Sequence, residues 1–429
     1  MKKATLYFCI LLFVFQFTLP AFSQKIKEIQ SNGDYYHVYR IKAVTERSSE
    51  IILPAYITGL SIELAPGCSF GKSSISAGGQ QYPVLANDHD EYQGKNLSFL
   101  ISFEQATDRF ELYNLMEGDS FLLHAYYAGT NPPPVKKKSF AEGGYDCSKP
   151  PTIDQSVWRD GLPAPKPNPE YTQTVHIIIH HTAGSNTITD HLTEIRNIYL
   201  YHTQTQGWDD IGYNFIIARD GTIYEGRDGQ LLYEDDFVKG AHFCGKNANT
   251  MGISLLGTYT AIEPTPESMQ SLLRLLLWKL HKDQLSVSDS FLHPQTGTDQ
   301  IMLPRIAGHR DGCATECPGT AFYLTFPRLR QMADSLIRNC PALSLSESAN
   351  TLPYRIFPNP AEDYLTISSS VNQVFSAVIT DLNGKAVLHL SSEYNTLSFS
   401  LSSLPKGVYF VKITDHEGTP YVIPFVKNN

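Results

Sequence analysis

Two histidines and one cysteine, in segments far apart along the chain, have the side-chain types of a metal site. His180 ends an apolar run, while His309 and Cys317 share a second, glycine-containing segment. Imidazole and thiolate are ligands that suit Zn²⁺, and three protein ligands leave a fourth position open for water. If these segments meet in space, the chemistry they predict is hydrolysis by an activated water.

The first candidate ligand needs a rigid support, and residues 175–179 provide one. Their uninterrupted apolar character is typical of a strand buried on both faces. His180 follows directly, and His181 is expected to point to the opposite face because side chains alternate along a strand. A buried structural role is the alternative for any one histidine taken alone.

Other hydrolytic chemistries fit the sequence less well. A cysteine–histidine nucleophile pair using Cys317 is one alternative. The proline that follows this cysteine and the two candidate histidine ligands favour a metal. The sequence contains neither a His-Glu-x-x-His nor a Gly-x-Ser-x-Gly segment, so those hydrolase classes have no support.

The region around these residues, 147–341, alternates strand and helix signals. Residues 215–225 predict a hairpin that turns at Asp220-Gly221, and 251–256 predict a strand. Thr265 caps a long helix with Pro266 in its first turn and leucines along one face. We therefore expect an α/β domain with a mixed β-sheet flanked by helices.

The remaining sequence divides into five further parts. Residues 1–23 have the basic start and apolar stretch of a signal peptide, and 24–130 alternate as a β-rich domain does. Residues 131–146 and 342–352 have the composition of linkers. Residues 353–429 predict about seven short strands in a C-terminal β-sandwich. The fold class is therefore multi-domain.

Charge and cysteine usage restrict the partners and the compartment. A net charge of −9 disfavours nucleic acid as a partner, because phosphate affinity comes from lysine and arginine. No stretch after the signal peptide is apolar enough to span a membrane, so the mature chain is expected to be exported and soluble. Export permits disulfides. We expect the pairs Cys244–Cys313 and Cys147–Cys340, although the count alone leaves other pairings open.

Several short segments of the region 150–340 carry a family resemblance. They are Ile179-His180-His181-Thr182, Gly207-Trp208-Asp209-Asp210-Ile211-Gly212-Tyr213-Asn214-Phe215, Asp220-Gly221-Thr222-Ile223-Tyr224-Glu225-Gly226-Arg227, Gly240-Ala241-His242, Asn249-Thr250-Met251-Gly252-Ile253, and Gly308-His309-Arg310 with Thr315-Glu316-Cys317-Pro318-Gly319. In this order they resemble a peptidoglycan recognition protein of the type 2 N-acetylmuramoyl-L-alanine amidase family, so 147–341 is expected to be a zinc amidase domain.

The resemblance implies a reaction and a role for each matching residue. Such enzymes cleave the amide between the lactyl group of N-acetylmuramic acid and the L-alanine of the stem peptide. By position, the Zn²⁺ ligands are His180, His309 and Cys317, and the catalytic helpers are Tyr213 and Thr315. The substrate-binding residues implied for peptidoglycan or muropeptides are His202, Trp208, Arg227, His242 and Asn249. Structural packing is the alternative for Tyr213 and Trp208, and an ordinary ion pair for Arg227.

The tail carries a second resemblance. Phe357-Pro358-Asn359-Pro360-Ala361, Asp381-Leu382-Asn383-Gly384-Lys385 and 404–411 are similar to the type A sorting domain of the type IX secretion system. This implies that 353–429 is a sorting domain recognised by the type IX machinery, and that the protein is secreted or held at the cell surface. A carbohydrate-binding sandwich is the alternative. For the whole chain, the alternatives to an amidase are a non-catalytic peptidoglycan-binding protein and a surface adhesin.

Overall fold

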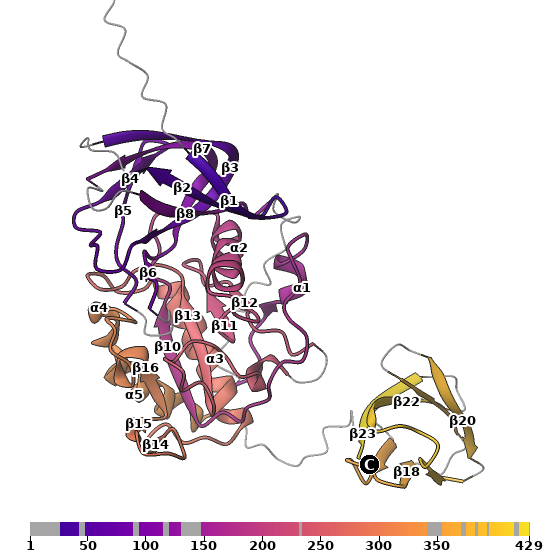
Figure 1. Cartoon of the computed structure of the whole chain (residues 1–429). Coiled ribbons are helices and arrows are strands. Elements are labelled where there is room, and N and C mark those ends of the chain that lie inside the picture. Colours follow the sequence, from indigo (N-terminus) through magenta and orange to yellow (C-terminus); the bar gives the residue numbers. More distant parts are fainter. Residues whose placement is uncertain are drawn as a thin grey trace, which may run out of the picture. The chain divides into compact units, whose positions relative to one another are not determined.

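The computed structural model describes residues 26–42, 48–88, 94–114, 120–129, 147–230, 234–340, 354–369, 375–381, 385–392, 394–415 and 420–428. The predicted signal peptide and both predicted linkers lie outside these ranges. The chain forms two compact units, Met1–Cys340 and Pro341–Asn429. Separate sheets occupy the two units, in keeping with a multi-domain chain (Figure 1).

A six-stranded sheet organises the central region, as the alternating signals predict. Its strands are β9 (Thr152–Ile153), β10 (His176–His181), β11 (Phe215–Ile217), β12 (Ile223–Glu225), β13 (Thr250–Leu255) and β16 (Ile306–Gly308). Their order is β16-β10-β13-β11-β12-β9. The β11–β12 hairpin is antiparallel and the other pairs are parallel, so the sheet is mixed. The register of β10 is fixed on both sides, as expected of a central buried strand.

Helices cover both faces of this sheet. They are α1 (Gln155–Trp158), α2 (His191–Leu200), α3 (Pro266–Lys282), α4 (Thr320–Tyr323) and α5 (Phe326–Ile337). The hydroxyl of Thr265 caps α3 by accepting the backbone N–H of Ser268 at 3.2 Å, as predicted. The apolar face of α3 packs with α5 against Ile177 and Ile179 of β10. A small hairpin, β14 (Ser290–His293) with β15 (Ile301–Pro304), lies apart from the main sheet.

The described residues between 26 and 126 form an eight-stranded antiparallel sheet with its own apolar core. The strands are β1 (Ile26–Asn32), β2 (Tyr36–Lys42), β3 (Ser48–Leu64), β4 (Ser74–Ala77), β5 (Gln80–Pro83), β6 (Asn96–Leu97), β7 (Ile101–Tyr113) and β8 (Ser120–Tyr126). This sheet packs on α2, which lies between it and the central sheet (Figure 1).

Polar side chains of α2 hold the two layers together. Buried Asn197 donates to the carbonyl of Thr58 at 2.9 Å and accepts the Thr58 hydroxyl at 2.6 Å. Buried Arg196 donates to the carbonyls of Ala128 and Trp158, each at 2.7 Å. Because buried polar groups are costly to leave unpaired, these bonds fix the N-terminal sheet on the central domain. The proposed boundaries at 130 and 147 therefore separate two parts of one packed unit.

Two disulfides have the predicted pairing. Cys244 joins Cys313 beside the candidate ligands, and Cys147 joins Cys340 at the two ends of the central domain. Cys68 and Cys317 are not in disulfides, which keeps the thiol of Cys317 available as a ligand.

In the part of the second unit that the structure describes, seven strands form two antiparallel sheets around a shared apolar core. They are β17 (Tyr354–Phe357), β18 (Tyr364–Ser369), β19 (Phe375–Thr380), β20 (Ala386–Ser392), β21 (Thr396–Ser400), β22 (Gly407–Asp415) and β23 (Pro420–Lys427). The predicted Asn383-Gly384 turn lies outside the described residues. Among the helices in the described ranges, none has the length and apolar character needed to cross a bilayer.

Candidate metal centre

Parallel pairing in the central sheet brings His180 and His309 together. Strand β10 lies beside β16 with Ile179 opposite Gly308. His309 opens the short turn η4 (His309–Asp311) immediately after β16. Residues that follow neighbouring parallel strands meet at the same sheet edge. The two imidazole rings accordingly lie 4.6 Å apart, centroid to centroid.

Cys317 completes the set from the loop after η4. Its Sγ lies 3.8 Å from Nδ1 of His180, and the backbone N–H of His181 donates to the same sulfur at 3.3 Å. One ligand atom from each of His180, His309 and Cys317 lies within 4.8 Å of the others, and all three residues are buried. Two imidazoles and a thiolate at this spacing fit Zn²⁺. His181 turns to the opposite face, where its Nδ1 accepts the N–H of Tyr259.

His242 lies behind His180 and orients it. Nε2 of His180 is 3.0 Å from Nδ1 of His242, and Nε2 of His242 is 3.3 Å from the hydroxyl of Thr250. That hydroxyl donates to the carbonyl of Asn247 at 2.8 Å. Thr250 must therefore accept from His242, so His242 accepts from Nε2–H of His180. This tautomer leaves the lone pair of His180 on Nδ1, the atom that faces Cys317.

Two glycines make room for the His242 ring. A Cβ added at Gly252 would lie 2.6 Å from Cδ2 of His242, and one at Gly240 would lie 2.3 Å from the same atom. Side chains at either position would clash with the imidazole. The residue is only 2% exposed, so the structure places His242 behind His180 in an orienting position, and its predicted role in binding substrate stays a prediction.

The two predicted catalytic helpers flank the metal centre. The ring of Tyr213 lies 5.3 Å from that of His180, and the residue is 6% exposed. The hydroxyl of Thr315 accepts the backbone N–H of Cys317 at 3.1 Å, and it lies 3.3 Å from Oδ2 of Asp88 in the N-terminal sheet region. Thr315 thus helps shape the loop that carries the sulfur ligand.

One cavity lies beside this centre, where Tyr213 and Thr182 line it, and a second cavity lies on the other side of an aromatic pair. The rings of His202 and Trp208 lie 4.6 Å apart. His202 faces one cavity, and Trp208 and Arg227 face the other. Arg227 is nearly buried, and its Nε donates to the carbonyl of Ile211 at 3.0 Å. Predicted substrate-binding residues thus line both cavities.

Asn249 is not brought to the metal centre. It precedes β13 and its carbonyl accepts the N–H groups of Val175 and His176, where β10 begins. His180 lies at the other end of β10, opposite Ser254. The structure therefore places Asn249 at the amino-terminal edge of the sheet, away from the candidate metal ligands, and its predicted role in binding substrate stays a prediction.

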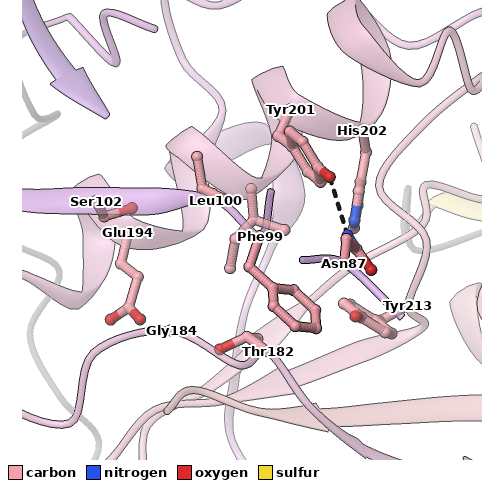
Figure 2. Close-up of a pocket in the computed structure, with 11 residues that line it drawn as sticks. Asn87, Phe99, Leu100, Ser102, Thr182, Gly184, Glu194, Tyr201, His202 and Tyr213 are labelled. Atoms are coloured by element: carbon pink, nitrogen blue, oxygen red, sulfur yellow. Dashed lines mark hydrogen bonds between the residues drawn. The ribbon is translucent and has the colours of Figure 1, made fainter. Parts of the chain in front are cut away.

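The cavity on the His202 side contains residues that the motifs did not indicate. Its lining residues are Asn87, Phe99, Leu100, Ser102, Thr182, Gly184, Glu194, Ile198, Tyr201, His202 and Tyr213 (Figure 2). Burial raises the pKa of Glu194, which pairs with Arg219 at 3.1 Å. Tyr201 and His202 lie in a π-helical turn, η2 (Tyr201–Thr205), that continues α2. Such turns are frequent at functional sites, but no spacing in the sequence marks this one.

Comparison with known proteins adds two family matches. Residues 170–320 match the N-acetylmuramoyl-L-alanine amidase family, and residues 355–423 match a secretion system C-terminal sorting domain. Peptidoglycan-recognition protein SC2 of Drosophila melanogaster is 36% identical over 147 residues, 34% of this chain and 68% of the relative. The N-acetylmuramoyl-L-alanine amidase of Homo sapiens is 30% identical over 184 residues, 41% of this chain but 28% of the relative.

The solved structures that resemble this chain include an N-acetylmuramoyl-L-alanine amidase and a peptidoglycan recognition protein. N-acetylmuramoyl-L-alanine amidase LysC from Clostridium intestinale URNW is 25% identical with a TM-score of 0.32, over 45% of this chain and 100% of that one. Peptidoglycan recognition protein LE in complex with tracheal cytotoxin is 28% identical with a TM-score of 0.33, over 41% and 92% of the two chains.

Proposed function

The chain belongs to the family of peptidoglycan-recognition proteins and N-acetylmuramoyl-L-alanine amidases, and on that premise we propose that it is a secreted, zinc-dependent amidase. Its substrate is peptidoglycan or a muropeptide. The bond it hydrolyses is the amide between the lactyl group of N-acetylmuramic acid and the L-alanine of the stem peptide.

The buried His180, His309 and Cys317 set carries this proposal. A role limited to binding peptidoglycan requires no cluster of three metal-ligand side chains, whereas hydrolysis of an amide at neutral pH requires an activated water. When bound to these residues, zinc lowers the pKa of a water towards about 7 and polarises a carbonyl oxygen. The backbone N–H of His181 and the Thr315 turn hold the sulfur in place.

Tyr213 supplies the hydrogen bond that the metal ligands do not. Its ring is fixed between those of His180 and His202, at 5.3 and 5.7 Å. A phenol held at this site donates to the oxyanion that develops as the amide carbon becomes tetrahedral. Thr315, beside the sulfur ligand, is the proposed second helper.

The cavity on the Trp208 side is suited to the stem peptide. Its charged lining residues include Lys166, Glu170, Arg227, Asp228 and Lys239. Stem peptides carry carboxylates and amines, which such a mixed lining pairs with.

The sorting-domain match indicates export by the type IX secretion system. We propose that the signal peptide 1–23 first directs the chain across the inner membrane. The enzyme then acts on peptidoglycan outside the cell or at its surface, because the sorting domain carries it away from the periplasm.

Metal content and chelation test the proposal. The purified full-length protein should contain about one zinc per chain, and its muropeptide hydrolysis should stop with a chelator and return with added zinc. Hydrolysis that persists after complete zinc removal would contradict the metal mechanism. Peptidoglycan binding without hydrolysis at full zinc occupancy would favour the non-catalytic alternative.

A further inference from the structure

The N-terminal sheet region contributes one wall of the cavity beside the metal centre. Asn87, Phe99, Leu100 and Ser102 come from the connections and strands around β5 to β7. The facing wall consists of central-domain residues. The family match begins only at residue 170, so this wall lies outside the matched domain.

Hydrogen bonds fix this wall on both sides of the site. Nδ2 of Asn87 donates to the hydroxyl of Tyr201 at 3.0 Å (Figure 2). Oδ2 of Asp88 accepts the backbone N–H of Glu316 at 2.9 Å and lies 3.3 Å from the Thr315 hydroxyl. Glu316 immediately precedes the ligand Cys317. The wall is therefore attached both to the π-helical turn and to the metal loop.

Phe99 is the aromatic side chain of this wall. Its backbone N–H donates to the carbonyl of Leu85 at 2.9 Å, which sets the direction of the side chain. The half-buried ring lies between Thr182 and Tyr213 (Figure 2). Thr182 follows the β10 histidines, and Tyr213 contacts His180. The ring of Phe99 is thus close to the position of the scissile amide.

The two cavities differ in chemistry, and this difference assigns them to the two halves of the substrate. The Trp208 side has several charged residues suited to a peptide. The Phe99 side has aromatic rings and the Asn87 amide, and its buried carboxylate Glu194 is paired with Arg219. The apolar C–H face of a sugar ring packs well on an aromatic ring, and an amide matches its acetamido or hydroxyl groups.

We propose that Phe99, with Asn87 beside it, contacts the N-acetylmuramyl half of the substrate and makes the enzyme select sugar-bearing peptides. This inference rests on the proposed function for the identity of the scissile bond. The N-terminal sheet is then a part of the substrate site, and Phe99 is a specificity-determining residue.

Two substrates that differ only in the sugar test this inference. One is an N-acetylmuramyl tripeptide, and the other is the D-lactyl tripeptide of the same sequence, which has the same scissile amide. We would measure kcat/KM for both by mass spectrometry with the full-length zinc-loaded protein. Binding of both would be measured by calorimetry in the Cys317→Ala background, where hydrolysis stops.

The preference ratio is the readout. The kcat/KM for the muramyl compound should exceed that for the lactyl compound. Phe99→Ala should reduce the ratio of these two values about tenfold, the scale of one lost aromatic contact. Phe99→Trp should keep the ratio. Tyr56→Ala, which changes an exposed aromatic of the same sheet that does not line the cavity, should leave it unchanged. Thermal unfolding and zinc content identify any variant that is misfolded.

Each result has one meaning. A Phe99→Ala protein that is folded and keeps the wild-type ratio overturns the inference, as does an unmodified chain with no preference. If the unmodified chain cleaves neither compound, the proposed function fails. In that case, tighter binding of the muramyl compound than of the lactyl compound, and loss of this difference in Phe99→Ala, still support the sugar contact. If neither compound binds, the sugar contact is overturned as well.

Discussion

His242→Leu should weaken zinc binding although His242 is not a ligand. The imidazoles of His180 and His242 are 0% and 2% exposed and lie 3.0 Å apart, Nε2 to Nδ1. Leucine fills most of the same space but accepts no hydrogen bond. The Nε2–H of His180 would then lack its acceptor, and the ring would lose the contact that keeps Nδ1 directed at Cys317.

The magnitude follows from the loss of one such orienting contact. Removing a partner of this kind costs about 10- to 100-fold in metal affinity, or about 1.4–2.7 kcal/mol. His242→Asn is the matched control, because its amide oxygen replaces Nδ1 as an acceptor. Its zinc affinity should lie much closer to that of the unmodified chain.

Competition with a chelator of known affinity, followed to equilibrium, measures the effect. Thermal unfolding with and without zinc provides a second measurement, since the stabilisation that a ligand gives the folded chain grows with the logarithm of its affinity. If His242→Leu binds zinc as tightly as the unmodified protein, the orienting role is wrong. If His242→Asn is as weak as His242→Leu, packing rather than hydrogen bonding is responsible.

Three further predictions concern catalysis and stability. Tyr213→Phe should lower kcat about 10²- to 10³-fold with little change in KM, the loss expected for one oxyanion donor; an unchanged kcat measured by steady-state kinetics would refute that role. Burial lowers the pKa of His176 from 6.5 to about 4, so the unfolded chain binds more protons between these values and stability should rise with pH across that window. In urea unfolding, the free energy of unfolding of the His176→Asn chain should rise less with pH across this window than that of the unmodified chain. An identical dependence on pH would refute this. Replacing Cys147 and Cys340 by serine removes a disulfide that spans 193 positions, whereas the Cys244–Cys313 disulfide spans 69. Because a longer closed loop restricts the unfolded chain more, losing the Cys147–Cys340 disulfide should lower the free energy of unfolding by about 1 kcal/mol more than losing the other. The reverse order of stability in calorimetry would contradict this.

The grouping of the three candidate metal ligands was predictable from the sequence because their placement depends on local rules. A continuous apolar strand ending in His180 fixes one ligand at a sheet edge, and a second strand before His309 fixes another. Strand alternation excluded His181. The two disulfides followed from the position of each cysteine relative to the metal loop and to the domain ends.

The same rules explain why Asn249 lies away from the candidate metal ligands. Asn249 precedes a strand that runs parallel to β10, whereas His180 and His309 follow theirs. Residues before and after parallel strands lie at opposite edges of the sheet. The sequence predicted the strand that follows Asn249, but the prediction of a binding role took no account of the direction in which that strand runs in the sheet.

The wall from the N-terminal sheet was not predictable from motifs. Its contacts, such as Asn87 with Tyr201, join residues separated by 114 positions, and no periodicity specifies such a pairing. His242 is a similar case, because its inward position depends on space left by Gly240 and Gly252. Both features follow from packing between distant segments.

The proposed amidase activity is best tested by mass analysis of muropeptides incubated with the zinc-loaded full-length protein and with its Cys317→Ala variant. The unmodified chain should release free stem peptide beginning at L-alanine and leave the N-acetylmuramyl product, and the Cys317→Ala variant should release neither. Intact muropeptides after incubation with the zinc-loaded chain, cleavage at another bond, or full activity of the variant would show that the proposed zinc amidase mechanism is wrong.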